Sequence, residues 1–377
     1  MKVVTRHLNK ETLIATGFVL FALSALFAFF DFVGRLDEIG TRFSAIEVIV
    51  LVLLELPSRV YEVMPIAALL GAVYTMSRWA ANSEFTILRV SGLSPVKLAM
   101  MLAVPGMILV STTYLLGEFV APAADKLRLE LRNADHGILK ARGYSSGVWI
   151  KDIARDKDGN VTHSRYVNVS NLVAGQNSKT GAWRVFEFDT KRNLTRVLHA
   201  GSANFIPHEG WHLFDSKIES LPKMTTDEQT VVSKAVTRHN ADVLLSSELT
   251  PAILGVMTVK PENMGIQDLW QYLKHLKDNR QTTDRYEIAL WSKVFYPMAI
   301  FVMLAVAMPF AYLNARSGGV SIKIFAGLMI GITFYTLNNL FSFLGVLNTW
   351  PPILVAVIPS ILMLIIASIG LWFVERR

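Results

Sequence analysis

Long apolar runs and one long polar stretch divide the chain. Six runs of mostly apolar residues form two groups of three, and the polar stretch 122–287 separates the groups. A helix needs about 20 predominantly apolar residues to cross the hydrocarbon core of a bilayer. The pattern therefore predicts six transmembrane helices, at 12–33, 45–76, 98–121, 288–313, 320–344 and 353–374.

The first apolar run follows three basic residues, Lys2, Arg6 and Lys10, as the core of a secretory signal peptide does. A signal-peptide core is only about 7–15 residues long, and this run is longer. The nearest match to a cleavage site, Ala22-Leu23-Ser24, lies in the middle of the run. We therefore expect a retained helix.

The polar stretch changes to a strand pattern after Gly147. Short segments rich in β-branched and aromatic residues alternate with turn-forming Gly, Asn and Asp residues. This pattern is typical of an antiparallel sandwich or jellyroll. We expect strands at 148–150, 165–169, 183–188, 195–198, 211–214 and 230–232. After Pro261 the period returns to that of a helix, and apolar residues share one face of 263–278.

These patterns predict an α-helical membrane protein with six transmembrane helices and an inserted all-β, jellyroll-like domain. The first transmembrane half covers 1–135 and includes a short helix at about 82–92. The β domain covers 136–262. A juxtamembrane helix and the second transmembrane half cover 263–377.

Composition supports the membrane assignment. Hydrophobic residues make up 52% of the 377 residues and charged residues 18%, whereas soluble domains carry about 25% charged residues. The chain has no cysteine, which excludes thiol catalysis and a disulfide framework. The sequence also lacks the motifs of P-loop nucleotidases, zinc proteases, serine hydrolases and kinases. We expect a non-catalytic subunit that binds no metal or cofactor.

The net charge of +7 reports the orientation of the chain. If the N-terminus is cytoplasmic, ten Lys and Arg residues lie on the cytoplasmic side, and the short outer loops contain only Arg35 and Arg42. Basic residues favour cytoplasmic loops. Both termini are therefore expected in the cytoplasm, with 122–287 on the opposite side. Most of the basic excess is explained in this way, so we expect no nucleic-acid partner.

The longest cytoplasmic loop, 77–97, contains a candidate docking helix. Asn82 or Ser83 is placed to cap a helix that Gly92 and Pro95 end. Apolar side chains three residues apart, together with an acid at the N-terminal end, suit docking into another protein. A simple membrane-surface connector explains the same residues equally well. The candidate docking residues are Ser83, Glu84, Phe85, Leu88 and Arg89.

Charged residues near the outer side suggest a second candidate site. Glu55, Arg59 and Glu62 lie in the second apolar run, spaced three and four residues apart, so that they can form ion pairs along a helix. A cationic rim that binds anionic lipid head groups is also predicted. Ordinary anchoring at the membrane interface explains the rim equally well. Its members are Arg35, Lys126, Arg128 and Arg132.

Several motifs resemble the LptF/LptG family of lipopolysaccharide export permeases. Residues 64–72 (MPIAALLGA) and 82–85 (NSEF) resemble the second span and coupling helix of the family. The end of the third span, 117–122 (GEFVAP), and the start of the fourth, 291–297 (WSKVFYP), fit as well, as does Pro351-Pro352. One departure is that Asp31, Asp37 and Glu38 accompany the single base Arg35 at the outer end of the first span.

The resemblance implies a half-transporter of the bacterial inner membrane. Such a permease pairs with the paralogous permease LptF, and a cytoplasmic ATPase dimer, LptB, binds ATP and magnesium and drives the pair. Lipopolysaccharide enters from the outer leaflet through lateral gates formed by the first and fifth spans. It then passes through the periplasmic β domains to a bridge of LptC and LptA. The same resemblance implies that the rim residues contact phosphates and that the helix at Glu84 receives the ATPase stroke.

Two other functions remain open from the residues alone. A secondary transporter independent of ATP would need matching discontinuous helices in its two halves. Prolines occur in both halves, but no convincing internal repeat does. A membrane-anchored periplasmic binding or receptor module would need neither six spans nor a docking helix.

Overall fold

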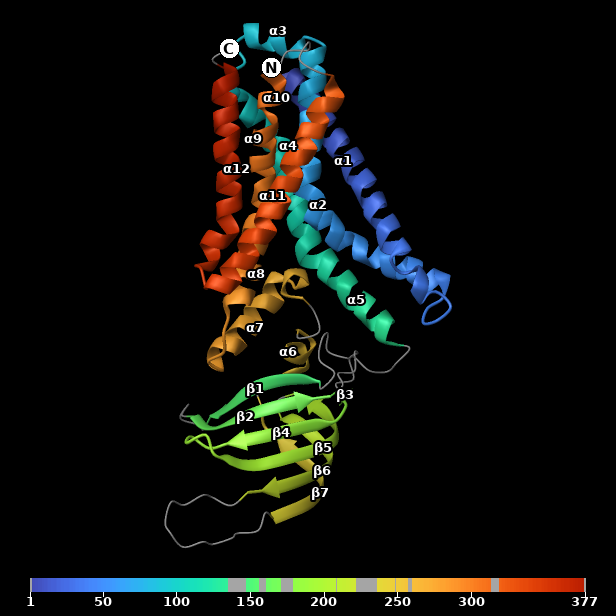
Figure 1. Ribbon diagram of the computed structural model, residues 1–377, viewed down its shortest axis with the longest axis vertical. Helices are drawn as coiled ribbons and strands as arrows, with labels where there is room; N and C mark the ends of the chain where they lie inside the picture. Colours follow the sequence, from blue (N-terminus) through green and yellow to red (C-terminus); the bar gives the residue numbers. More distant parts are fainter. Residues whose placement is uncertain are drawn as a thin grey trace. The chain divides into compact units, whose positions relative to one another are not determined.

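The chain consists of two compact units in the computed structural model (Figure 1). One unit contains Met1–Arg128 and Asp284–Arg377, and the other contains Leu129–Thr283. The boundaries predicted from the sequence lie at 135/136 and 262/263. The structure describes residues 2–134, 147–155, 161–170, 179–207, 209–221, 236–247, 249–256, 260–312 and 319–375.

The first unit is helical. Its first half comprises α1 (Lys2–Val33), η1 (Leu36–Glu38), α2 (Ala45–Ala81), α3 (Glu84–Val90), α4 (Pro95–Leu115), η2 (Leu116–Val120) and α5 (Ala121–Ala134), the last of which continues into the second unit. Its second half comprises α8 (Asp284–Phe295), η4 (Tyr296–Met298), α9 (Ala299–Ala307), α10 (Pro309–Tyr312), α11 (Val320–Asn348) and α12 (Pro352–Glu375). Figure 1 shows α3, the start of α1 and the end of α12 at the same end of this unit.

Two of the long helices begin at well-formed caps. At the start of α2, the Ser44 side chain accepts a hydrogen bond from the Glu47 backbone N–H, and the Glu47 carboxylate accepts one from the Ser44 N–H. At the start of α4, the Ser94 hydroxyl accepts a hydrogen bond from the Lys97 N–H, next to Pro95 in the first turn. These caps satisfy backbone donors that have no partner within the helix.

Five helical segments of the described chain are long and apolar enough to cross a membrane. They are Val3–Val33, Pro95–Arg132, Asp284–Tyr312, Val320–Asn348 and Pro352–Val374. The sixth predicted span lies in α2, which is not among the five. Instead, α2 is buried on all sides from Val63 to Val73 and packs against α1, α9, α10 and α11. A helix that is apolar all round belongs in such a central position.

The second unit is built around one antiparallel sheet. Its strands are β1 (Val148–Arg155), β2 (Val161–Val169), β3 (Lys179–Thr180), β4 (Trp183–Phe188), β5 (Leu194–Ile206), β6 (Gly210–Ser220) and β7 (Val236–Leu245). The strand order is β1-β2-β4-β5-β6-β7, and β3 pairs with β5. The antiparallel β insertion is thus confirmed. All described strands belong to this sheet, and the jellyroll stays a prediction. The predicted strand 230–232 lies outside the described residues.

One face of the sheet carries the apolar core of the second unit. Cross-strand neighbours such as Ile150, Val167, Val185 and Leu198 form a continuous buried row. The two largest buried side chains, Trp183 and Trp211, lie with ring centroids 4.8 Å apart. The short helices α6 (Pro251–Val256) and η3 (Pro261–Asn263) follow the sheet. The helix predicted at 263–278 is α7 (Ile266–Asp278), which buries Leu269, Tyr272, Leu273 and Leu276 as expected.

The contact between α1 and α2 depends on a glycine. A Cβ atom at Gly71 would lie 2.4 Å from Thr16 Oγ1 and 2.5 Å from the Thr16 backbone nitrogen. Small residues allow helices to approach this closely in membranes. The backbone of α1 therefore lies directly against α2 at this point.

We predict that Gly71→Ala destabilises the helical unit by about 1–3 kcal/mol, because the added methyl group meets the Thr16 backbone. Thermal unfolding of the detergent-solubilised chain measures the effect. The matched control is Gly17→Ala, since a Cβ atom at Gly17 meets nothing within 4 Å. Equal melting temperatures for the two variants would contradict the prediction.

Candidate functional site

A carboxylate in the helical unit holds arginines from separate segments. Glu55 on α2 accepts hydrogen bonds through Oε2 from Arg35, which follows α1, and from Arg128 on α5, the latter at 3.3 Å. The side chains of Arg35 and Arg128 are only 15% and 14% exposed. Glu55 therefore ties α2 to the end of α1 and to α5.

Further ion pairs surround this centre. Arg59 lies 3.6 Å from Glu55 and 3.6 Å from Glu62 on its own helix, as its spacing in the sequence predicts. Arg59 also donates two hydrogen bonds, of 3.1 and 3.2 Å, to Asp31 on α1.

On α5, Arg128 contacts Asp125 at 3.0 Å, and Asp125 accepts a hydrogen bond of 2.9 Å from Ser58. Asp125 is almost fully buried. These contacts link α5 to α2 and complete a connected polar group between apolar helices.

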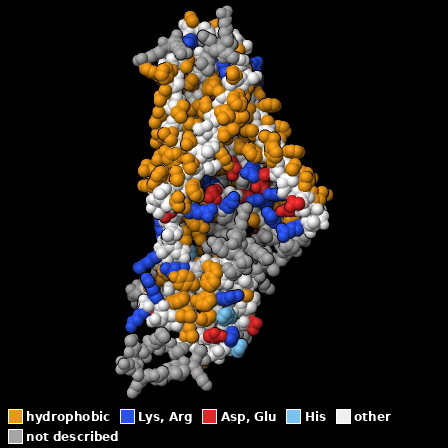
Figure 2. All heavy atoms as spheres, in the orientation of Figure 1, with side chains coloured by type: hydrophobic (Ala, Val, Ile, Leu, Met, Phe, Trp, Pro, Cys, Tyr) orange, Lys and Arg blue, Asp and Glu red, His pale blue; other side chains and the backbone are white. Residues whose placement is uncertain are grey.

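We call this group the outer ion cluster, consisting of Asp31, Arg35, Glu55, Ser58, Arg59, Glu62, Asp125 and Arg128. Three guanidinium groups meet four carboxylates. Figure 2 shows acidic and basic side chains intermingled beside the apolar surface of the helical unit. In apolar surroundings each charge needs such a partner, because desolvation of an isolated ion is very costly.

The structure places the four predicted rim residues in different environments. Arg35 and Arg128 meet at one carboxylate and are held by acids of the chain itself. Lys126 and Arg132 lie on the same helix, α5, and both are exposed. The acids Asp31 and Glu55, which the prediction of a cationic rim left out, belong to the site.

The predicted docking helix is present as α3, with a different outward face. Phe85 is buried, and its ring meets that of Tyr312 edge to face at 5.0 Å. The Arg89 guanidinium lies over the same Tyr312 ring. Leu88 packs against the core of the unit. Phe85, Leu88 and Arg89 therefore fasten α3 to its own chain.

Two large apolar residues that α3 exposes were not among the predicted docking residues, whereas the predicted Glu84 is exposed beside them. Ile87 and Val90 are 65% and 86% exposed, and Glu84 is exposed one turn before Ile87. Ser83 precedes the helix in a left-handed conformation and makes no capping bond through its side chain. Asn82 instead donates a hydrogen bond of 3.3 Å to the Glu84 carboxylate. Gly92, at a φ of +89°, lies just beyond the helix, as expected.

A second polar group lies on the core face of the sheet. Asp152, Arg165, Glu187 and Arg196 are direct cross-strand partners on β1, β2, β4 and β5, so that acids and bases alternate along one row. Arg165 lies 3.6 Å from Asp152 and 3.0 Å from Glu187. Arg196 completes the row with two hydrogen bonds to Glu187, of 2.7 and 3.0 Å. We call this row the charge ladder.

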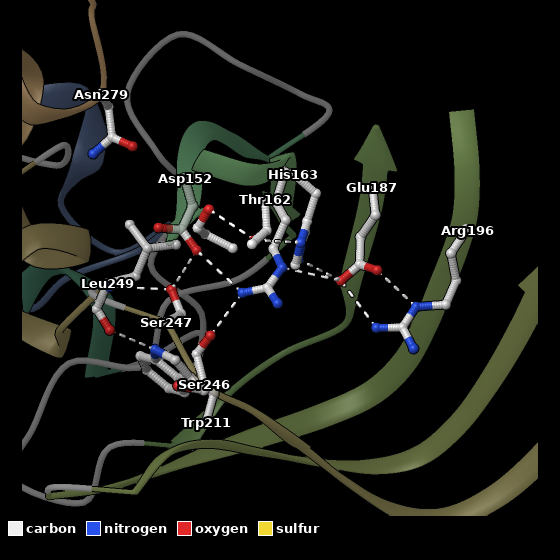
Figure 3. A network of polar contacts seen from close by, with 12 residues as sticks. Asp152, Thr162, His163, Glu187, Arg196, Trp211, Ser246, Ser247, Leu249 and Asn279 are labelled. Carbon is white, nitrogen blue, oxygen red and sulfur yellow. Dashed lines mark hydrogen bonds and ion pairs between the residues drawn. The ribbon is translucent and has the colours of Figure 1, made fainter. Parts of the chain in front are cut away.

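The charge ladder also holds the segment that follows β7 (Figure 3). Arg165 donates a hydrogen bond of 2.6 Å to the Ser246 carbonyl, and Ser247 donates one of 2.8 Å to Asp152. Close by, the Trp211 indole donates to the Leu249 carbonyl at 2.7 Å. The ladder therefore joins sheet and connector, and its charges are satisfied within the chain. Among the described residues, no group of three or more His, Asp or Glu side chains is arranged to hold a metal ion.

Comparison with known proteins covers almost the whole chain. The family model described as "Lipopolysaccharide export system permease LptF/LptG" matches residues 6–373. The chain belongs to the LptF/LptG family. It is 29% identical over 379 residues to the lipopolysaccharide export system permease protein LptG of Escherichia coli K12, covering 100% of this chain and 98% of that protein. It is 25% identical over 374 residues to the LptG of Haemophilus influenzae, covering 99% and 98%.

Membership of the LptF/LptG family confirms the resemblance seen in the motifs. The family is one of transport permeases, which agrees with a non-catalytic chain. The membrane helices and the β-sheet region are present as described above. In this LptF/LptG protein the outer ion cluster and the exposed face of α3 are the two candidate functional sites.

The pKa values of two residues, Glu187 in the charge ladder and the nearby His163, are lowered. Burial raises the pKa of Glu187, but hydrogen bonds and charge from Arg196, together with the charge of Arg165, outweigh it and lower the pKa below 4.5. Burial lowers the pKa of His163 below 6.5, and the nearby charge of Arg165 lowers it further. His163 Nε2 lies 3.9 Å from Glu187. Folding therefore favours a neutral His163 and an ionised Glu187.

Both shifts predict loss of stability in acid. Below pH 6.5 the unfolded chain protonates His163 more readily than the folded sheet does. The free energy of unfolding therefore falls as the pH drops through this region. Below pH 4.5 the stabilisation from ionised Glu187 is lost as well. We expect the urea midpoint for unfolding of β2 and β4 to fall in these two stages as the pH is lowered. Unfolding is measured by hydrogen-exchange pulse labelling, with every labelling pulse given at the same pH.

The variant His163→Gln should lose the stage near pH 6.5 and keep the stage below pH 4.5. His212→Gln, which changes a histidine at the other end of the sheet, serves as the control and should keep both. An unchanged pH profile in His163→Gln would contradict the assignment.

Proposed function

We propose that this chain is one of two permease subunits of an ATP-driven exporter of lipopolysaccharide. The exporter extracts lipopolysaccharide from the outer leaflet of the bacterial inner membrane and passes it to a periplasmic bridge. The partners are a paralogous LptF-type permease, a cytoplasmic LptB-type ATPase dimer that binds ATP and magnesium, and LptC and LptA. The chain itself supplies no catalytic group and binds no cofactor.

One observation carries this proposal: the apolar side chains of α1 are exposed along the helix, and the guanidinium group of Arg35 follows its end. Only 6% of its most apolar segment is buried, and Ile14, Phe18 and Phe21 are more than 60% exposed. Arg35 follows the helix directly. A lipid with acyl chains and phosphates matches such a surface, because its chains can lie along α1 while a phosphate contacts Arg35.

The membrane topology belongs to the same proposal. We take α2 as the sixth span, surrounded by the other helices, and both termini as cytoplasmic. The end of the helical unit that carries α3 then faces the cytoplasm, and 122–287 lies in the periplasm. Ten of the 14 basic residues outside 122–287 are on the cytoplasmic side in this orientation, in keeping with the positive-inside rule.

The direct test is co-purification from the native membrane. We expect the tagged, detergent-solubilised chain to bring down an ATPase subunit, a second permease and phosphorylated lipopolysaccharide. Added ATP should be hydrolysed by the complex and not by the chain alone. Transport into vesicles without any ATPase would instead identify a secondary transporter, and a chain isolated with only a soluble ligand would identify a receptor.

The exposed face of α3 gives a second prediction. Ile87→Asp should reduce co-purification of the ATPase by roughly tenfold or more, because a charge replaces an exposed apolar contact at the interface. The melting temperature of the chain itself should change little, since Ile87 is exposed. Glu84→Ala should also weaken assembly.

Phe85→Ala is the matched control within the same helix. Phe85 is buried against Tyr312, so its truncation should lower the stability of the chain by about 3 kcal/mol. Normal ATPase association in Ile87→Asp would show that this face is not the docking surface.

A further inference from the structure

The outer ion cluster contains an anion that competes with any ligand for Arg35 and Arg128. Both guanidinium groups contact the same oxygen of Glu55. Within the described part of the chain, Glu55 is the only acid in contact with Arg35. A phosphate oxygen placed between these two arginines would thus occupy the position of Glu55 Oε2.

The other contacts of the cluster make such an exchange possible. Glu55 Oε1 lies 3.6 Å from Arg59, so the carboxylate keeps a cationic partner after Arg35 and Arg128 leave it. Arg128 likewise keeps Asp125 at 3.0 Å. Arg35 exchanges one anion for another. No buried charge is left without a partner at any stage, which is the condition that avoids a large desolvation cost.

Competition from the resident acids also makes the site bind a phosphate less tightly than two unoccupied arginines would. The cluster as defined holds four carboxylates and three guanidinium groups, so an entering phosphate competes with resident acids for the arginines. A transporter must release its cargo, and a resident carboxylate that re-forms its ion pairs assists that release. Phosphate and guanidinium groups form strong bidentate hydrogen bonds, which allows the incoming phosphate to displace the Glu55 carboxylate.

We infer that Glu55 is a built-in counter-ion that occupies a phosphate site formed by Arg35 and Arg128, and that the phosphate of an entering lipid displaces it. This inference rests on the proposed transport of lipopolysaccharide. It assigns to an acidic residue the role of setting how tightly the cargo is held.

The test compares Glu55→Gln with Glu62→Gln in the full complex reconstituted in nanodiscs. Glu62 is the matched control, since it contacts Arg59 at 3.6 Å and neither Arg35 nor Arg128 among the pairs described. The probes are purified lipopolysaccharide, the same lipopolysaccharide after dephosphorylation, and inorganic phosphate. Binding and the rate of ATP-dependent release are measured for each.

We expect Glu55→Gln to bind lipopolysaccharide about tenfold more tightly, the effect of losing one competing ionic contact, and to release it more slowly. Dephosphorylated lipopolysaccharide should show no gain, and Glu62→Gln should match the wild type. Equal or weaker binding by Glu55→Gln, with normal binding by the wild type, overturns the inference. A gain for inorganic phosphate alone would also overturn it, by assigning the site to free phosphate.

Failure of the proposed function gives a different result, because the wild-type complex would then not bind lipopolysaccharide at all. If Glu55→Gln does not assemble, Glu55→Asp replaces it. The shorter carboxylate keeps the charge but contacts the two arginines less closely, so binding should still tighten, by a smaller factor. Unchanged or weaker binding in Glu55→Asp overturns the inference as well.

Discussion

Charged groups placed among apolar helices must find partners, and this requirement shapes the helical unit. Arg35, Arg59 and Arg128 come from separate segments, yet the carboxylate of Glu55 contacts all three. The cost of leaving any of them without an anion is far larger than the gain from one surface ion pair. The segment after α1 and the helix α5 are therefore both tied to α2 by ion pairs.

The same principle applies to the sheet in a different form. There the charges alternate along a cross-strand row, from Asp152 through Arg165 and Glu187 to Arg196. The neighbouring row through Ile150, Val167 and Val185 is apolar. A row of alternating charges fixes the register of four strands, because a shift by one residue would place these side chains on the opposite face. Strand pairing and connector attachment thus depend on one set of contacts.

Local pattern was enough to predict most of the elements. Apolar run length predicted the membrane helices, although α4 begins at Pro95, three residues before the predicted span. The β insertion and α7 followed from periodicity. The site residues were harder to predict, because periodicity shows that α3 has two faces but not which one meets the rest of the chain. Phe85 was expected to point outward and instead packs on Tyr312, which is distant in sequence.

Partners that come from distant segments explain the other gaps. Glu55 and Arg59 were predicted to pair because they share a helix, whereas the pairing of Glu55 with Arg35 and Arg128 depends on how three segments meet. The charge ladder depends on strand register, which no motif encodes. The strand β7 was missed for a local reason: its segment, which includes Thr237, His239, Asn240 and Asp242, lacks the apolar alternation that marked the other strands.

The anchoring of α3 has a mechanical consequence. Phe85 and Arg89 both contact the ring of Tyr312, and Tyr312 ends α10 in the second half of the helical unit. The chain also connects α3 directly to α2 and α4 in the first half. A displacement of α3 is therefore transmitted to both halves, because the helix is attached to each of them. Loss of the Tyr312 ring would remove the contacts of Phe85 and Arg89 with α10 and leave the chain connections to α2 and α4.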